Sequence, residues 1–162
     1  MTMPTVTIVI PVLNDAPMLA RCLEAIARQT LRPDSIVVVD NGCTDDSAAI
    51  ARAAGATVVR EPVRGILPAT ARGFDTATGE ILARIDADSR PEADWLRRVM
   101  KHFESDPDLA AVTGTGEFYG GGRLRRFLGR HLYLGGYFFW VGLLLGHPPL
   151  YGSNFAIRAE TW

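Results

Sequence analysis

The chain has 162 residues, of which 48% are hydrophobic and 22% are charged, the composition of one globular domain with a hydrophobic core. Its formal net charge of -1 excludes a broadly basic surface, so we expect no nucleic-acid partner. Cys22 and Cys43 form no Cys-x-x-Cys pair, which argues against a zinc site or a disulfide framework. The N-terminus lacks a signal-peptide pattern, and we expect a reducing, cytoplasmic location.

Apolar runs and amphipathic segments alternate along the chain. Residues 5–12 are rich in β-branched side chains with almost no polar interruption, which predicts a strand covered on both faces. Apolar side chains in residues 18–29 recur at helical spacing and predict an amphipathic helix. The pattern continues with strands predicted at 35–40, 56–61, 80–86 and 109–116 and helical segments at 44–55, 65–79 and 92–107. This order predicts an α/β fold with a mainly parallel sheet flanked by helices.

Polar side chains stand at the ends of the first, second and fourth predicted strands: Asn14 and Asp15, Asp40 and Asn41, and Asp86 and Asp88. A polar turn after one strand is common for solubility alone. In open α/β sheets, however, ligands bind outside the carboxyl ends of the strands. We therefore expect the three endings to converge on one site.

The segment Asp86-Ala87-Asp88 carries the most specific chemistry. In an extended segment, side chains two residues apart point to the same side, so the two carboxylates would lie close together and repel each other. A divalent cation removes this conflict, and Mg²⁺ or Mn²⁺ commonly takes one or two carboxylates together with phosphate oxygens. The pair predicts a site for a metal-bound diphosphate. The alternative is structural, with Asp88 capping the turn before Pro91 and Asp86 merely solvated.

Four ordered segments together resemble the family 2 glycosyltransferases, inverting enzymes with the GT-A fold. They are VTIVIPVLND, ARQTLRPDSIVVVDNGCTDDS, ATGEILARIDADSRPEADWL and GSNFAIRAETW, and they cover nearly the whole chain. The resemblance implies a GT-A fold, a nucleotide-diphosphate sugar donor, and Mn²⁺ or Mg²⁺ as cofactor. It does not identify the acceptor, which could be a sugar, a lipid or another molecule.

The resemblance also assigns roles to the residues at the ends of the first two strands. It implies that Pro11, Asn14 and Asp15 line the nucleotide edge, and that Asp40 and Asn41 contact the base and ribose. The family usually has two adjacent aspartates at the second strand end. Asn41 replaces one of them here, and an amide adds a hydrogen-bond donor.

Further roles fall on the Asp-x-Asp segment and on a loop before it. The resemblance implies that Asp86 faces the ribose or the metal and that Asp88 is the more direct metal ligand. Arg64 and Gly65 lie where the family often approaches the nucleotide, and an arginine there could offset diphosphate charge. The alternative for Arg64 is a solvated loop arginine.

The catalytic base remains unassigned. In the family it is an acidic residue in a Glu-Asp type motif beyond the Gly-Ser-Asn strand, whereas this sequence ends at Trp162 and Glu160 lies too early. We therefore expect a truncated transferase, or a base supplied from elsewhere. The alternatives are a non-catalytic nucleotide-sugar-binding module or inactive fragment, and a nucleotidyltransferase. The last would normally show a glycine-rich phosphate loop, which PVLNDAP lacks.

The last part of the sequence differs in character, and we expect a nucleotide-sugar-binding domain over 1–116 and the start of an acceptor-side region over 117–162. Residues 132–146 carry no charge and are dense in aromatic and leucine side chains, but they are fewer than the roughly 20 residues that cross a bilayer. The arginine-rich run 123–131 precedes them, which fits a segment at the cytoplasmic face of a membrane. The alternative is a core helix, or one covered by a further part of the protein.

Overall fold

The computed structural model describes residues 3–114, 135–146 and 150–162. The strands are Val6–Val12 (β1), Ser35–Asp40 (β2), Thr57–Arg60 (β3), Ile81–Ile85 (β4), Ala111–Thr113 (β5) and Asn154–Arg158 (β6). The helices are Ala16–Ala27 (α1), Ser47–Ala53 (α2), Ile66–Thr76 (α3), Trp95–Ser105 (α4) and Gly135–Leu145 (α6), followed by a 3₁₀ turn at Ala159–Thr161.

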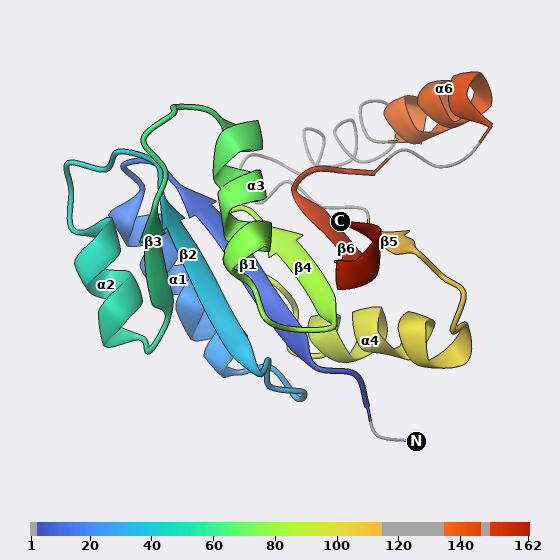
Figure 1. Cartoon of the computed structure of the whole chain (residues 1–162), viewed down its shortest axis with the longest axis horizontal. Coiled ribbons are helices and arrows are strands. Elements are labelled where there is room, and N and C mark those ends of the chain that lie inside the picture. The colour runs from blue at the N-terminus through green and yellow to red at the C-terminus, as the bar shows by residue number, and fades with distance from the viewer. Residues whose placement is uncertain (1–2, 115–134, 147–149) are drawn as a thin grey trace, which may run out of the picture.

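The strands form one sheet in the order β3-β2-β1-β4-β6-β5 (Figure 1). The pairs β1–β2, β1–β4 and β2–β3 are parallel, whereas β4–β6 and β5–β6 are antiparallel. The predicted α/β fold with a mainly parallel sheet is confirmed. The fifth strand predicted at 109–116 is present as the short β5, but it lies at the edge, because β6 inserts between it and β4.

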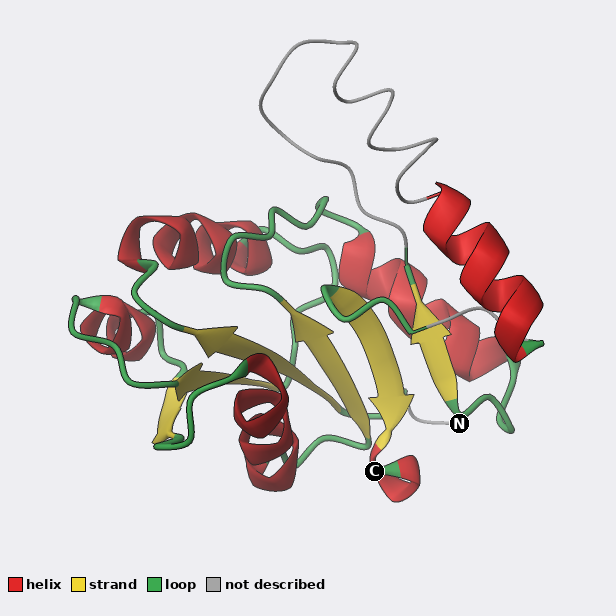
Figure 2. Cartoon of the chain, turned by 90° about the horizontal axis from the view of Figure 1, so that it is seen from above, coloured by secondary structure: helices red, strands yellow, loops and turns green. Residues whose placement is uncertain are grey.

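Helices cover both faces of the sheet (Figure 2). Every residue of β1 is buried, and its side chains alternate between two cores. Ile8 and Ile10 pack with α1 and α4 on one face, while Val9 packs on the other face with Phe74 of α3. The continuous apolar run that predicted a strand covered on both faces therefore matches its position at the centre of the sheet.

The residues after 150 return to this sheet. Leu82, Ala83 and Arg84 of β4 pair with Ile157, Ala156 and Phe155 of β6, in that order. The single sheet therefore includes a strand from residues 117–162, the region expected on the acceptor side, and the division near residue 116 stays a prediction. Helix α6 lies beyond the β5 edge, apart from the helices that cover the sheet (Figures 1 and 2).

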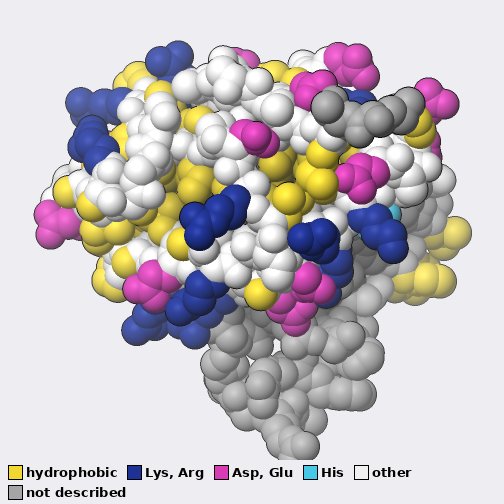
Figure 3. All heavy atoms as spheres, turned by 90° about the horizontal axis from the view of Figure 1, so that it is seen from below, with side chains coloured by type: hydrophobic (Ala, Val, Ile, Leu, Met, Phe, Trp, Pro, Cys, Tyr) yellow, Lys and Arg dark blue, Asp and Glu magenta, His cyan; other side chains and the backbone are white. Residues whose placement is uncertain are grey.

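Helix α6 contains most of the charge-free stretch 132–146, of which residues 132–134 lie outside the described residues. It has 11 residues, and none of the helices in the described ranges is long and apolar enough to cross a membrane. The arginine-rich run 123–131 lies outside the described residues. On the face seen in Figure 3, acidic and basic side chains are interspersed, in keeping with the net charge near zero.

Gly73 sets the distance between α3 and the sheet. A Cβ atom at this position would overlap Cγ1 of Val9 and would lie 2.9 Å from Cγ2 of Val39. Only a residue without a side chain lets the helix backbone approach β1 and β2 so closely.

We predict that Gly73→Ala lowers the free energy of unfolding by about 1–3 kcal/mol, because the added methyl group overpacks the contact with Val9 and Val39. Gly136→Ala in α6 is the matched control, since a Cβ there meets no atom within 4 Å. Urea unfolding of both variants checks the expectation. A Gly73→Ala protein as stable as the parent would contradict the close packing of α3.

Candidate functional site

An open cleft of about 230 Å³ lies at the carboxyl ends of β1 and β4. It is lined by Pro11, Val12, Leu13, Asp15, Ile66, Asp86, Ala87 and Asp88. Its three carboxylates come from the segments that follow two adjacent parallel strands. The cleft therefore combines apolar walls with a concentration of negative charge.

The charges in the cleft affect one another. Burial, followed by the charges of Asp88 and Asp45, raises the pKa of Asp15 above its ordinary value. Burial, followed by Asp88 and Asp86, raises the pKa of the Cys22 thiol to about 12, so this side chain stays protonated and uncharged. A cation in the cleft would relieve this repulsion.

The Asp-x-Asp segment forms a turn. Strand β4 ends at Ile85, and the N–H of Ser89 donates to the carbonyl of Asp86 at 3.0 Å. The expectation that an extended backbone aligns the two carboxylates is therefore wrong, because the chain leaves the sheet at this point. Asp86 and Asp88 nevertheless line the same cleft.

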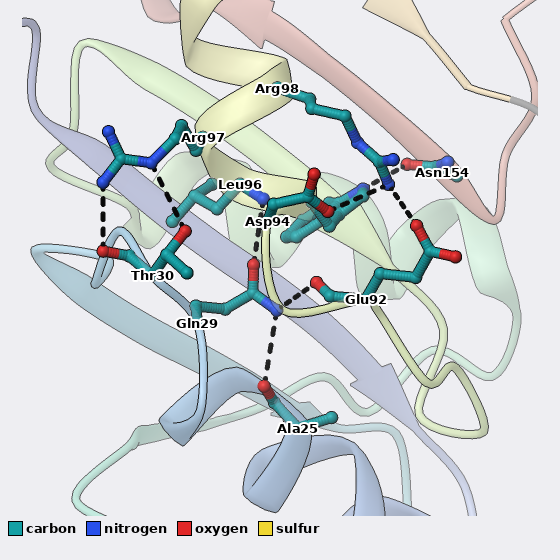
Figure 4. A network of polar contacts seen from close by, with 10 residues as sticks. Ala25, Gln29, Thr30, Glu92, Asp94, Leu96, Arg97, Arg98 and Asn154 are labelled. Atoms are coloured by element: carbon teal, nitrogen blue, oxygen red, sulfur yellow. Dashed lines mark hydrogen bonds and ion pairs between the residues drawn. The ribbon is translucent and has the colours of Figure 1, made fainter.

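A polar network braces the chain that follows this turn (Figure 4). Gln29, two residues after the end of α1, donates to the carbonyl of Glu92 at 2.6 Å and accepts from the N–H of Leu96 at 2.9 Å. The indole N–H of Trp95 donates to Oδ1 of Asn154 at 2.9 Å. These hydrogen bonds hold the start of α4 against the segment after α1 and against β6. The turn that carries Asp88 therefore lies between β4 and a helix start that is held in place.

The ends of β1 and β2 are joined by side-chain hydrogen bonds. Oδ1 of Asp40 accepts from the N–H groups of Gly42 and Cys43 at 3.1 and 2.7 Å. Burial raises the pKa of Asp40, but the hydrogen bonds from Cys43 and Gly42 outweigh it and lower the pKa below its ordinary value. Asn14, in the left-handed region at φ 51°, accepts from the N–H of Thr44 at 2.7 Å.

Asn41 is buried and holds the loop that leads to α3. Its Nδ2 donates to the carbonyls of Glu61 and Val63 at 3.0 and 2.7 Å, and its Oδ1 accepts from the N–H of Gly65 at 2.8 Å. Both ends of the amide are therefore engaged by this loop. The predicted contact with base or ribose stays a prediction.

Arg64 lies in the same loop, above the turn that follows β2. A Cβ on Gly42 would be 3.7 Å from Nε of Arg64, which places the guanidinium over this glycine. Of the residues expected from the sequence, Pro11, Asp15, Asp86 and Asp88 line the cleft. Asp40 is the last residue of β2, and the others lie in the loops next to the cleft: Asn14, Asn41, Arg64 and Gly65.

Two polar residues that hold the segments around the site were not predicted from the sequence. Nothing in the sequence indicates the structural role of Gln29, because a glutamine near the end of a predicted helix is common. Arg84 does have a sequence signal, since a charged residue within the apolar run of a central strand is unusual. Its Nη2 lies 2.6 Å from Oδ1 of Asp86, and its side chain is only 7% exposed.

No group of three or more His, Cys, Asp or Glu side chains in the described ranges could hold a metal ion by itself. Asp86 and Asp88 instead offer carboxylate oxygens at an open cleft. This matches the way Mg²⁺ or Mn²⁺ is held by one or two carboxylates while substrate phosphates and water complete its coordination. The donor set is compatible with a metal that arrives with a diphosphate.

Comparison with known proteins agrees with the fold. The sequence matches the family described as Glycosyl transferase family 2 over residues 7–160. It is 30% identical over 131 residues to glycosyltransferase AglE of Haloferax volcanii, covering 76% of this chain and 40% of that protein. It is 41% identical over 106 residues to a PGL/p-HBAD biosynthesis glycosyltransferase of Mycobacterium bovis, covering 61% of this chain and 41% of that protein.

Solved structures of glycosyltransferases have a similar fold. Mannosyltransferase PcManGT from Pyrobaculum calidifontis, in complex with GDP-Man and Mn²⁺, has a TM-score of 0.72 and 27% identity over 98% of this chain and 46% of its own. Glucosyl-3-phosphoglycerate synthase from Mycobacterium tuberculosis, with Mn²⁺, UDP-Glc and phosphoglyceric acid, has a TM-score of 0.71 and 26% identity over 97% of this chain and 57% of its own.

These matches define the fold as that of the GT-A glycosyltransferases. The chain belongs to glycosyltransferase family 2, as the resemblance of its motifs predicted. It spans 40% and 41% of the two curated relatives and 46% and 57% of the two solved chains.

We predict that Asn41→Asp lowers the free energy of unfolding by about 1–3 kcal/mol, because a carboxylate cannot donate to the carbonyls of Glu61 and Val63. Asn14→Asp is the matched control: Asp keeps the oxygen that accepts from Thr44, so stability should change little. Chemical unfolding measures both. Equal stability of Asn41→Asp and the parent would show that the amide does not hold the loop.

Proposed function

We propose that this chain is the donor-binding part of a glycosyltransferase that transfers a sugar from a nucleotide-diphosphate donor with inversion. The observation that carries the proposal is the cleft in which Asp15, Asp86 and Asp88 meet at the carboxyl ends of β1 and β4. The similar solved enzymes with GDP-Man or UDP-Glc and Mn²⁺ support the donor class and the metal.

In this proposal Asp88 is the direct metal ligand, and Asp86 faces the ribose or the same metal. A bound divalent cation would neutralise the charge that develops on the departing diphosphate. Pro11 and Asp15 form the wall beside β1, and Asp40 and Asn41 lie at the base and ribose end. The loop held by Asn41 carries Arg64 and Gly65, which in this proposal would face the nucleotide.

Inverting transfer also needs a base that removes the acceptor proton and an acceptor held for in-line attack. We assign neither to a residue of this chain. The second candidate is therefore a module that binds the nucleotide sugar without transferring it. Release of free nucleoside diphosphate from a donor, measured with the chain as it stands, separates the two, because a pure binding module releases none.

We predict that nucleoside diphosphates bind more tightly when Mn²⁺ is present, and that Asp88→Ala weakens this binding by more than about tenfold because it removes a metal ligand. Calorimetric titration with UDP and GDP, with and without Mn²⁺, gives the measurement. The control is Asp108→Ala, an exposed aspartate of the loop before β5. Unchanged Mn²⁺-dependent binding by Asp88→Ala would remove its role as a ligand.

We also propose that α6 contacts a lipid surface. Phe139, Trp140, Leu143 and Leu144 are 63–84% exposed and α6 has no charged residue, so a large apolar surface faces outward. The arginines of the sequence run 123–131 precede it and would attract anionic headgroups. This partner fits a transferase that works at a membrane face.

We predict that the chain co-sediments with vesicles of equal parts phosphatidylcholine and phosphatidylglycerol. Trp140→Glu combined with Leu144→Glu should reduce this binding by at least about tenfold, since two large apolar side chains no longer enter the interface. Leu67→Glu in α3 is the control, because Leu67 is 78% exposed on another helix. Vesicle binding unaffected by the double variant, or a self-associated chain that ignores vesicles, would contradict the proposal.

A further inference from the structure

Arg84 is a buried arginine in β4, the strand that leads into the acidic cleft. Its Nη2 lies 2.6 Å from Oδ1 of Asp86. The centre of its guanidinium is 5.9 Å from the centre of the Phe155 ring, and a Cβ on Gly152 would lie 2.9 Å from its Nη1. The guanidinium is therefore enclosed by β6 and the loop before it, and its charge is directed at Asp86.

Fold stability alone does not account for this arginine. Burying a charged group costs free energy unless its donors are all paired, and Nε of Arg84 has no hydrogen-bond acceptor in the part of the chain that the structure describes. Burial lowers the pKa of Arg84, although the charge of Asp86 opposes this effect. An unbranched apolar side chain would fill the same space without these costs.

We infer that Arg84 is a positioning residue that fixes the carboxylate of Asp86 in the cleft for the incoming donor. The ion pair engages Oδ1 and leaves Oδ2 to accept a hydrogen bond from the donor or to contact its metal. The inference rests on the proposed function, because it concerns how the same cleft holds its ligand.

The charge of Arg84 has a second effect in the cleft. Three carboxylates face one another there, and the guanidinium offsets one of these charges from behind. The charge that remains is matched by a single divalent cation. Arg84 thus lowers the negative charge that a metal-bound diphosphate meets in the cleft, while its own side chain stays out of the solvent.

The first test compares two strand arginines. We expect Arg84→Met to weaken binding of UDP or GDP in the presence of Mn²⁺ by about tenfold, the loss of one charged hydrogen bond that orders Asp86. We expect its melting temperature to be maintained. The control is Arg158→Met in neighbouring β6, whose guanidinium donates to the carbonyls of Leu109 and Phe103. That variant should lose stability and keep the affinity of the parent.

The second test asks whether Arg84 acts through Asp86. In a double-mutant cycle, Arg84→Met should have little further effect on nucleotide affinity once Asp86→Asn is present. A purely structural arginine would give the same loss in both backgrounds. Only one nitrogen of Arg84, Nη2, makes the contact with Asp86, so a lysine at this position should recover part of the nucleotide affinity that Arg84→Met loses. If Asp86→Asn fails to fold, the comparison of Arg84→Lys with Arg84→Met tests whether Arg84 acts through Asp86.

The outcomes of these tests distinguish a failure of the inference about Arg84 from a failure of the proposed function. If the parent shows no Mn²⁺-dependent nucleotide binding, the proposed function is wrong and the inference is lost with it. If the parent binds and Arg84→Met binds equally well, or Arg84→Lys is no better than Arg84→Met, only the inference is overturned.

Discussion

The repulsion between carboxylates at one sheet edge is the constraint on which the site depends. Asp15 follows β1 and Asp86 and Asp88 follow β4, and these strands are parallel neighbours, so the sheet itself brings the charges together. The raised pKa of Asp15 means that its contribution to stability is present below its ordinary pKa of 3.8 and is lost as the pH rises above it. At neutral pH the carboxylates repel one another in the folded chain, which lowers the free energy of unfolding, and a bound cation would offset this loss.

The surrounding structure keeps these groups in place before any ligand arrives. Gln29 and Asn154, from opposite parts of the sequence, both bind the start of α4, and Arg84 holds Asp86 from within the sheet. Asn41 holds the loop on the other side. A site whose members are already ordered loses less conformational entropy when it binds, which favours affinity for a small, highly charged ligand.

Much of the fold could be predicted because its signals are local. The buried strand predicted at residues 35–40 is β2 with the same bounds. The polar ends of β1, β2 and β4 were expected to converge on one site: Asp15, Asp86 and Asp88 line one cleft, whereas Asp40 and Asn41 at the end of β2 are not among its lining residues. The alternation of strands and helices was sufficient for these features, because each depends on the side-chain pattern of a short segment.

The features that were missed depend on distant contacts. No local pattern indicates that β6 inserts between β4 and β5, or that Gln29 reaches Glu92 and Leu96. The turn at Asp86 was expected as extended chain because apolar periodicity does not mark where a strand leaves its sheet. Asn41 was considered only as a ligand contact, since its carbonyl partners follow β3, about twenty residues further along the chain.

The central claim is that the carboxylates around this cleft hold one divalent cation together with a diphosphate. The most direct measurement is anomalous diffraction from crystals of the chain soaked with Mn²⁺ and a nucleoside diphosphate. Our account predicts a single manganese peak between the carboxylate of Asp88 and the diphosphate oxygens, within reach of Asp86. A nucleotide bound elsewhere, or manganese bound away from the ends of β1 and β4, would contradict it.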